Sequence, residues 1–244
     1  MISDNVRRVE NTIIRACERV GRDSATVTLV AVSKTKPAAQ VVEAYAAGIR
    51  HFGENRVEEA NAKIVAVNAE LDVPPMWHMV GHIQSRKARD VVAYQGQRLF
   101  GLVHSVDDAP LAAKLDRAVG LIGGPRLPWL AQVNVSGETS KSGFDGLGWE
   151  REPAVLDTLV SQLREAVALP GLDLRGLMTM APIADDAEEI RPVFRSLAGL
   201  RGELEQRLGV ALPELSMGMT DDYEVAVEEG ATIVRVGRAI FGER

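Results

Sequence analysis

Short apolar runs alternate along this chain with longer amphipathic stretches, and the alternation repeats eight times. The runs lie at residues 27–32, 49–52, 77–80, 99–104, 129–135, 174–178, 214–216 and 232–236. Several are apolar at consecutive positions, as in residues 29–32, which is typical of parallel strands covered by helices. Repeated strand–helix units predict an α/β protein. Eight of them without a long linker favour a single-domain (β/α)8 barrel of the TIM type over an open doubly wound sheet.

Helical patterns fill the intervals between these runs. We expect helices near 38–47, 55–69, 85–94, 107–118, 152–167, 193–208 and 221–229, with a short piece at 238–242. An additional N-terminal helix is predicted at about 4–20, with Ser3 or Asp4 as its N-cap. One face of that helix carries the apolar stripe Val6, Val9, Ile13, Cys17 and Val20. Residues 120–128 are predicted to form a surface loop, and residues 1–244 to form one domain.

Composition argues against several classes of function. The 244 residues carry a net charge of −6, which disfavours a nucleic-acid or anionic-membrane partner. No stretch approaches the roughly 18 apolar residues of a membrane span, and the N-terminus lacks the apolar run of a signal peptide. Cys17 is the single cysteine, so an intrachain disulfide is impossible and the reducing cytoplasm is the expected location.

A lysine stands at the end of the first predicted strand. Lys34 follows residues 27–32 directly and is expected at the mouth of a barrel, where barrel enzymes place their working residues. Burial disfavours an ammonium, and the neutral amine that results is a nucleophile towards aldehydes. The alternative is that Lys34 and Lys36 are solvated loop charges, one of them paired with Glu54.

The second and third strands end in further polar residues. Asn55 follows Gly53 and Glu54, and it is predicted either to line the mouth or to cap the next helix. His78 and His82 share one face of the third strand, so a metal pair is conceivable. The sequence offers neither a cysteine partner nor an HExxH helix, so packing and hydrogen bonding are the favoured roles and no metal is expected.

The loop after the fifth strand, residues 134–143, is rich in small polar residues and contains Lys141. It is similar to a phosphate-binding loop but lacks the GxxxxGK[ST] pattern, so a Walker nucleotide site is unsupported. A mobile polar loop remains the alternative.

The last two strand ends form the most informative segment. Loops after strands seven and eight of barrels often bind phosphate together with a short extra helix. Ser216 offers a hydroxyl, and Gly218 and Gly237 allow backbone N–H groups to approach an anion. Arg238 would begin the terminal helix. A phosphate on one side of the mouth and the Lys34 amine on the other suit a phosphorylated aldehyde.

At these positions the chain resembles the pyridoxal 5′-phosphate (PLP) homeostasis protein family, the YggS/PROSC type. The resemblance covers nearly the whole chain, and its segments are specific only in combination. They are residues 30–37 (VAVSKTKP), 51–55 (HFGEN), 77–85 (WHMVGHIQS), 140–143 (SKSG), 174–178 (LRGLM), 215–222 (LSMGMTDD), 234–237 (VRVG) and 241–242 (FG).

The resemblance implies a barrel like the alanine racemase N-terminal domain, with PLP held as a Schiff base on Lys34. It implies that Ser216, Gly218 and Gly237 hold the phosphate and that Arg235 faces the pyridine nitrogen. Asn55, Met217 and Arg238 complete the predicted cofactor-binding residues. Two positions depart from the family pattern: Arg238 replaces a small residue, and could contact phosphate or turn outward, and Thr220 replaces a common serine.

The implied role is to bind, store or deliver PLP to dependent apoenzymes, without robust turnover. The rival is an amino-acid racemase, which needs two acid/base groups on opposite faces of the reacting carbon. Related racemases take the second, a tyrosine, from a separate domain of a partner subunit, and none of Tyr45, Tyr94 and Tyr223 has an obvious reason to reach the cofactor. A third possibility is a barrel enzyme acting on a sugar-phosphate aldehyde through Lys34. A monomer is expected, and whether Lys141 holds a second PLP is open.

Overall fold

Parallel strands close into a barrel in this computed structural model, which describes residues 1–138 and 141–243. Around the barrel the order is β1 (Thr28–Val32), β2 (His51–Glu54), β3 (Met76–Met79), β4 (Leu102–Val106), β5 (Leu127–Asn134), β7 (Leu172–Met178), β8 (Glu214–Ser216) and β9 (Ile233–Val236). β9 pairs with β1 and closes the ring, Leu29 lying opposite Val234. The predicted (β/α)8 barrel and all eight predicted strands are confirmed. The two-residue strand β6 (Phe144–Asp145), which pairs in parallel with the end of β5 outside the ring, was not predicted.

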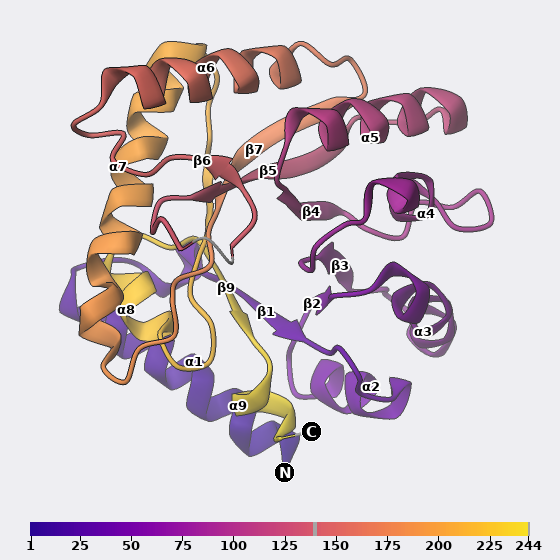
Figure 1. The fold of residues 1–244 in the computed structure, drawn as a ribbon. Coiled ribbons are helices and arrows are strands. Elements are labelled where there is room, and N and C mark those ends of the chain that lie inside the picture. Colours follow the sequence, from indigo (N-terminus) through magenta and orange to yellow (C-terminus); the bar gives the residue numbers. More distant parts are fainter. Residues whose placement is uncertain (139–140, 244) are drawn as a thin grey trace.

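Helices surround the barrel (Figure 1). They are α1 (Ile2–Arg19), α2 (Ala38–Ala46), α3 (Val57–Glu70), α4 (Ala88–Val92), α5 (Ala109–Ile122), α6 (Pro153–Val167), α7 (Arg191–Leu208), α8 (Tyr223–Glu228) and α9 (Arg238–Phe241). Short 3-10 turns lie at Ser24–Thr26, Ser85–Lys87 and Ala187–Ile190. None of the helices in these described ranges has the length and apolar composition needed to cross a membrane.

Three local predictions were wrong. Helix α1 begins at Ile2 with Met1 as its N-cap, so neither Ser3 nor Asp4 caps it. Helix α5 continues to Ile122, because Gly120 is tolerated within the helix and the turn falls at Gly123, where φ is +78°. The loop predicted at 120–128 is therefore confined to the few residues before Leu127.

Helix α1 occupies the position that an eighth outer helix would fill. The last strand is followed only by the four-residue helix α9, and α1 packs against α2, α8 and α9 (Figure 1). Its buried face includes Val6, Val9, Ile13 and Cys17, as the stripe predicted, whereas Val20 lies at the C-cap and is 43% exposed. The Asn5 side chain donates a hydrogen bond to the Ile240 carbonyl at 2.9 Å. The N-terminal helix thus completes the outer layer beside the closing strands.

Strand residues alternate between the barrel interior and the outer helices. The inward positions include a small apolar cluster formed by Val30, Leu102, Leu130, Met178 and Ile233. The much larger apolar core lies between the strands and the helices. Inward residues beyond this small cluster therefore set the chemistry of the barrel interior and of its mouth.

A matched pair on α1 tests its role in closing the outer layer. Ile13 is 5% exposed and Ile14 is 40% exposed. We expect Ile13→Ala to lower the free energy of unfolding by about 2–5 kcal/mol through lost burial and a cavity. Ile14→Ala should change it by about 0.5 kcal/mol or less. Urea denaturation measures both, and equal losses would contradict the packing of α1 described above.

Candidate functional site

The strand register brings the predicted site residues to one end of the barrel. Arg235 on β9 lies opposite Val30 on β1, and Val32 lies opposite Gly53 on β2. Lys34 follows β1 in a turn and is partly buried. The carboxyl ends of β1 and β9 are thus neighbours, and so are those of β1 and β2.

The turn that carries Lys34 is held on both sides. Thr35 has φ of +65°, and its backbone N–H donates to Glu59 Oε1 at 2.6 Å. Lys36 Nζ donates to the carbonyls of Phe241, Gly242 and Glu243 at 3.2, 3.3 and 3.0 Å. Lys36 is therefore a cation bound to the carbonyl groups at the end of α9, and it does not pair with Glu54.

Glu54 pairs with a lysine on α3. Its Oε1 accepts from Lys63 Nζ at 2.9 Å and from the Ser33 hydroxyl at 2.6 Å. Burial raises the pKa of Glu54, and the contacts with Ser33 and Lys63 act in the opposite direction. Ser33 and Glu54 lie on the outer side of their strands, so this buried pair joins the barrel to α3.

Asn55 does not cap the following helix, because Arg56 is the N-cap of α3. Its Oδ1 is buried and has no hydrogen-bond partner within the described residues. Gly81 permits this arrangement, since a Cβ at that position would lie 2.3 Å from the Asn55 carbonyl oxygen. A buried amide with an unmet hydrogen bond suits contact with a polar ligand.

Arg235 and Ser216 form a buried polar pair inside the barrel. Arg235 is 5% exposed and donates to Ser216 Oγ at 2.6 Å and to the Thr179 carbonyl at 2.9 Å. Burial lowers the pKa of Arg235 to about 10, so the guanidinium stays charged at neutral pH, and Asp222 opposes the shift. The nearby acids Asp221 and Glu224 pair with other arginines, Asp221 with Arg238 and Glu224 with Arg19.

The remaining predicted phosphate residues lie after β8 and β9. Met217 is fully buried, and Gly218 has φ of +95°, where a Cβ would lie 2.6 Å from that of Ala226. A Cβ at Gly237 would lie 3.3 Å from the Val32 carbonyl oxygen. Arg238 is half exposed and pairs with Asp221, with Glu243 at 3.6 Å. The glycine backbones are thus close-packed at the strand ends, while the Arg238 guanidinium lies at the surface.

Three histidines form a hydrogen-bonded row that was not predicted. His51 Nδ1 lies 3.0 Å from His78 Nε2, and His78 Nδ1 lies 2.8 Å from His104 Nε2. His104 Nδ1 lies 2.8 Å from Ser216 Oγ. Burial lowers the pKa of His78 to about 3 and that of His104 well below its usual value, so both rings are neutral. The row joins the buried Arg235–Ser216 pair to His51, the first residue of β2.

The prediction that His78 and His82 share one face of the third strand is wrong. His82 lies beyond the end of β3, its side chain is 61% exposed, and its Nδ1 contacts Asp107 at 3.0 Å. Among residues 1–138 and 141–243, no group of three or more His, Cys, Asp or Glu is placed to hold a metal ion.

Residues around the fifth strand end bond mainly among themselves. Asn134 Nδ2 donates to the Glu138 carbonyl at 3.1 Å, and Gln132 Nε2 donates to the Ser142 carbonyl at 2.7 Å. Lys141 Nζ lies 3.7 Å from Glu138. Thr139 and Ser140, which belong to the predicted polar loop, lie outside the described residues.

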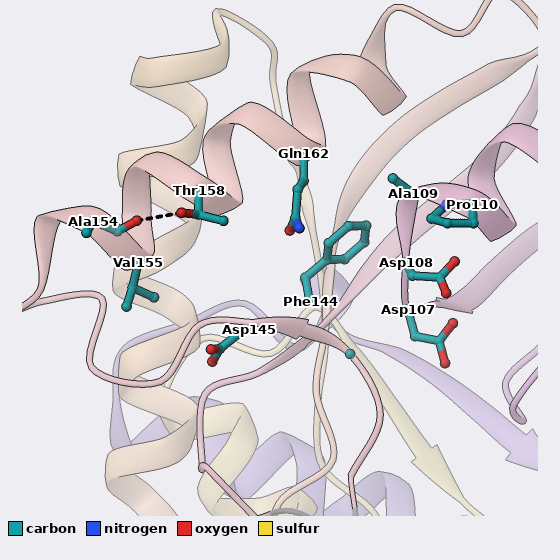
Figure 2. Close-up of a pocket in the computed structure, with 11 residues that line it drawn as sticks. Asp107, Asp108, Ala109, Pro110, Phe144, Asp145, Ala154, Val155, Thr158 and Gln162 are labelled. Atoms are coloured by element: carbon teal, nitrogen blue, oxygen red, sulfur yellow. Dashed lines mark hydrogen bonds between the residues drawn. The ribbon is translucent and has the colours of Figure 1, made fainter.

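A cleft of about 430 Å³ beside the barrel is acidic. Figure 2 shows Phe144 at its centre, with the side chains of Asp107 and Asp108 on one side of the ring in this view and Asp145 on the other. Carboxylates repel a phosphate, so this cleft does not suit an anionic cofactor. A second cleft of about 650 Å³ is lined by Asn55 together with Arg56 and other residues of mixed charge.

Comparison with known proteins identifies close relatives. A sequence model of the alanine racemase N-terminal domain matches residues 6–244. The pyridoxal phosphate homeostasis protein of Pseudomonas aeruginosa is 46% identical over 247 residues, which cover 100% of this chain and 96% of that protein. The protein of the same name from Escherichia coli K12 is 40% identical over 248 residues, with coverage of 100% and 97%.

Solved structures agree with the fold. PipY of Synechococcus elongatus PCC7942 with PLP bound matches with a TM-score of 0.79 and 36% identity, over 99% of this chain and 100% of that one. Alanine racemase of Corynebacterium glutamicum matches with a TM-score of 0.65 at 16% identity, over 100% of this chain and 60% of that one. The second likeness is one of fold alone.

The buried histidines predict a pH dependence of stability. Folding lowers the pKa of His78, so between its ordinary value and about 3 the unfolded chain binds a proton that the folded chain does not. The contribution of His78 is complete above its unfolded pKa and is lost as pH falls towards its folded pKa. We expect His78→Gln to flatten the decline of unfolding free energy below about pH 6.5, by up to about 1.4 kcal/mol per pH unit.

His82→Gln is the matched control, because His82 lies at the surface. Urea denaturation across this pH range gives the slopes. Parent-like slopes for His78→Gln would show that His78 titrates normally in the folded protein.

Proposed function

The chain belongs to the alanine racemase N-terminal domain family and, within it, to the pyridoxal phosphate homeostasis proteins, and on that premise we propose that it binds PLP as a Schiff base on Lys34 and stores and delivers the cofactor. One observation carries the proposal. The pairing of β1 with β9 sets the Lys34 turn beside the strand that carries Arg235 and is followed by Gly237.

The residues at the mouth fit the parts of PLP. Gly218 and Gly237 are close-packed without side chains at the ends of β8 and β9, and a phosphate there would meet backbone N–H groups. Arg235 offers a buried guanidinium for the pyridine ring. The Asn55 side-chain oxygen, directly after β2, has no hydrogen-bond partner among the described residues. Met217 is fully buried directly after β8. Ser216 contacts the site indirectly, because its hydroxyl oxygen accepts a hydrogen bond from Arg235.

Lys34 supplies the covalent link. When bound, PLP provides an electrophilic aldehyde and an electron-withdrawing ring. Lys34 would hold the cofactor through its Nζ, because an amine can condense with that aldehyde with loss of water. The Thr35–Glu59 and Lys36–carbonyl contacts keep the neighbouring residues of the turn in place while Lys34 reacts.

Arg235 disfavours further chemistry. A guanidinium only donates hydrogen bonds, so it keeps a proton off the ring nitrogen that it faces. An unprotonated ring is a weaker electron sink. Racemisation also needs a second acid/base group, and the tyrosines of the described residues lie in other contacts. Tyr45 donates to the Val73 carbonyl at 2.8 Å, Tyr94 follows α4, and Tyr223 lies on α8 near Thr12. We propose that amino-acid turnover is absent or weak, and that the role of a racemase is less well supported than that of a PLP carrier.

The proposal extends to partners and location. PLP-dependent apoenzymes are the proposed recipients of the cofactor, and nucleic acid and membranes are not proposed as partners. We propose that the protein works as a monomer in the cytoplasm. The Arg238–Asp221 pair at the surface argues that Arg238 contributes to the phosphate site through its backbone more than through its charge.

The lysine assignment is tested by the absorption of the purified protein with PLP added. The parent protein should show the visible band of lysine-bound PLP, and borohydride should fix the cofactor to the Lys34 peptide. Lys34→Ala should lose the band, and Lys114→Ala, a lysine on α5 outside this turn, should keep it. A label on Lys36 or Lys141, with normal binding by Lys34→Ala, would refute the assignment.

The proposed lack of turnover is tested with L-alanine in deuterated water. The PLP-loaded protein should yield little D-alanine, because racemisation needs a second acid/base group and we propose that the tyrosines of the described residues do not supply it. A PLP-dependent alanine racemase serves as the positive control. Turnover at about 1 per second or faster would establish an ordinary enzyme and overturn this part of the proposal.

A further inference from the structure

A chain of hydrogen bonds crosses the interior of the barrel. It runs from Arg235 through Ser216, His104 and His78 to His51, over heavy-atom distances of 2.6, 2.8, 2.8 and 3.0 Å. Arg235, Ser216, His104 and His78 are each 5% exposed or less, and His51 is partly buried. Buried polar groups are costly unless they are hydrogen-bonded, so a continuous row of this kind calls for a defined hydrogen position at every step.

Arg235 favours one direction for the row, in which the Ser216 hydroxyl uses its hydrogen on His104. A guanidinium has no acceptor, so Ser216 Oγ accepts from Arg235. The Ser216 hydroxyl can then give its own hydrogen to His104 Nδ1. A neutral imidazole has one donor and one acceptor nitrogen, so His104 carries its hydrogen on Nε2 and donates to His78 Nδ1. By the same rule His78 donates from Nε2 to His51 Nδ1.

We propose that His51, His78 and His104 are positioning residues for the cofactor site, all held as Nε2–H tautomers, and that a proton on His51 breaks their row. The inference rests on the proposed function, in which Arg235 faces the pyridine ring. Ser216 and His104 fix one arm of the guanidinium, and the Thr179 carbonyl fixes another. The histidines act on the ligand only through Arg235.

His51 is the end of the row that a proton can reach. It begins β2, at the end of the barrel away from Lys34, and shares a surface cleft with Glu10 and Arg50. Burial lowers the pKa of His51, and Glu214 on β8 acts in the opposite direction. Arg50 is turned away, since its Nη1 donates to the carbonyls of Tyr45 and Ile49. On β3, His78 contacts His51 Nδ1 through its Nε2.

Acid therefore disrupts the row from this end. A protonated His51 has hydrogens on both nitrogens, so it can only donate to His78 Nε2, and the donor order of the row can no longer hold. Because the folded pKa of His51 lies below its ordinary value, the contact is intact at neutral and alkaline pH and is lost as pH falls through that folded pKa. The hold on Arg235 then loosens, and cofactor affinity falls.

The first test is histidine ¹⁵N NMR of the PLP-free protein near neutral pH. The chain has four histidines, and exposed His82 is the internal reference. His51, His78 and His104 should all show a protonated Nε2 and an unprotonated Nδ1. An Nδ1–H tautomer at any of the three would overturn the proposal, whether or not PLP binds.

The second test measures the affinity for pyridoxine 5′-phosphate, which lacks the aldehyde and so cannot react with Lys34. His51→Leu removes the acceptor for His78 and should weaken binding about threefold to tenfold at about pH 8. His51→Asn places an amide oxygen near the position of Nδ1 without a titrating group and should restore that loss. His82→Asn is the surface control.

The pH dependence of binding distinguishes a positioning role of His51 from a merely structural one. Between about pH 8 and the lowest pH at which both proteins stay folded, the parent should lose about threefold to tenfold more affinity than His51→Asn, since titration of the ligand phosphate is common to both. Equal pH profiles for parent and His51→Asn would overturn the role of His51. If the parent fails to bind PLP itself at about pH 8, the proposed function fails, and the NMR result still decides the row.

Discussion

Pairing between the first and last strands of the ring is the contact on which the site depends. β1 and β9 are separated by almost the whole sequence, yet Thr28 lies opposite Ile233 and Ala31 opposite Val236. That register sets the level of Arg235 relative to the Lys34 turn, because each residue along a strand adds about 3.3 Å. Helix α1 stabilises the same junction from outside, where α9 is too short to cover it. A shift of one residue would turn Arg235 out of the barrel.

The barrel interior is divided between apolar and polar contents. Val30, Leu102, Leu130, Met178 and Ile233 form the apolar part, while the three histidines, Ser216 and Arg235 form the polar part. An entirely apolar interior would avoid the free-energy cost of burying these polar side chains. The polar part gives Arg235 one orientation and keeps a permanent cation beneath the mouth. Such a cation favours an anionic ligand and a ring nitrogen that accepts a hydrogen bond.

Local signals predicted the strands and the Lys34 position, because apolar runs and their ends are encoded within a few residues. Helix limits were less accurate where two signals conflicted, as at Gly120, a weak helix former that α5 nevertheless includes. The histidine row was missed for another reason. His51, His78 and His104 are far apart in sequence, and their contact depends on the registers of β2, β3 and β4. Three inward-facing histidines on consecutive strands are the signal that could have revealed it.

The turn that carries Lys34 is held from outside the barrel. Thr35 adopts a left-handed backbone conformation, which costs a non-glycine residue about 1–3 kcal/mol unless the surroundings enforce it. Two contacts enforce it here: Glu59 on α3 binds the Thr35 N–H, and Lys36 binds the carbonyls that follow α9. Glu59 also lies 3.2 Å from Lys63, the lysine that pairs with Glu54. The Lys34 turn is thereby connected to both the second strand and the end of the chain. Movement of α3 or of the residues after α9 would shift the amine relative to Arg235, which stays anchored in the barrel.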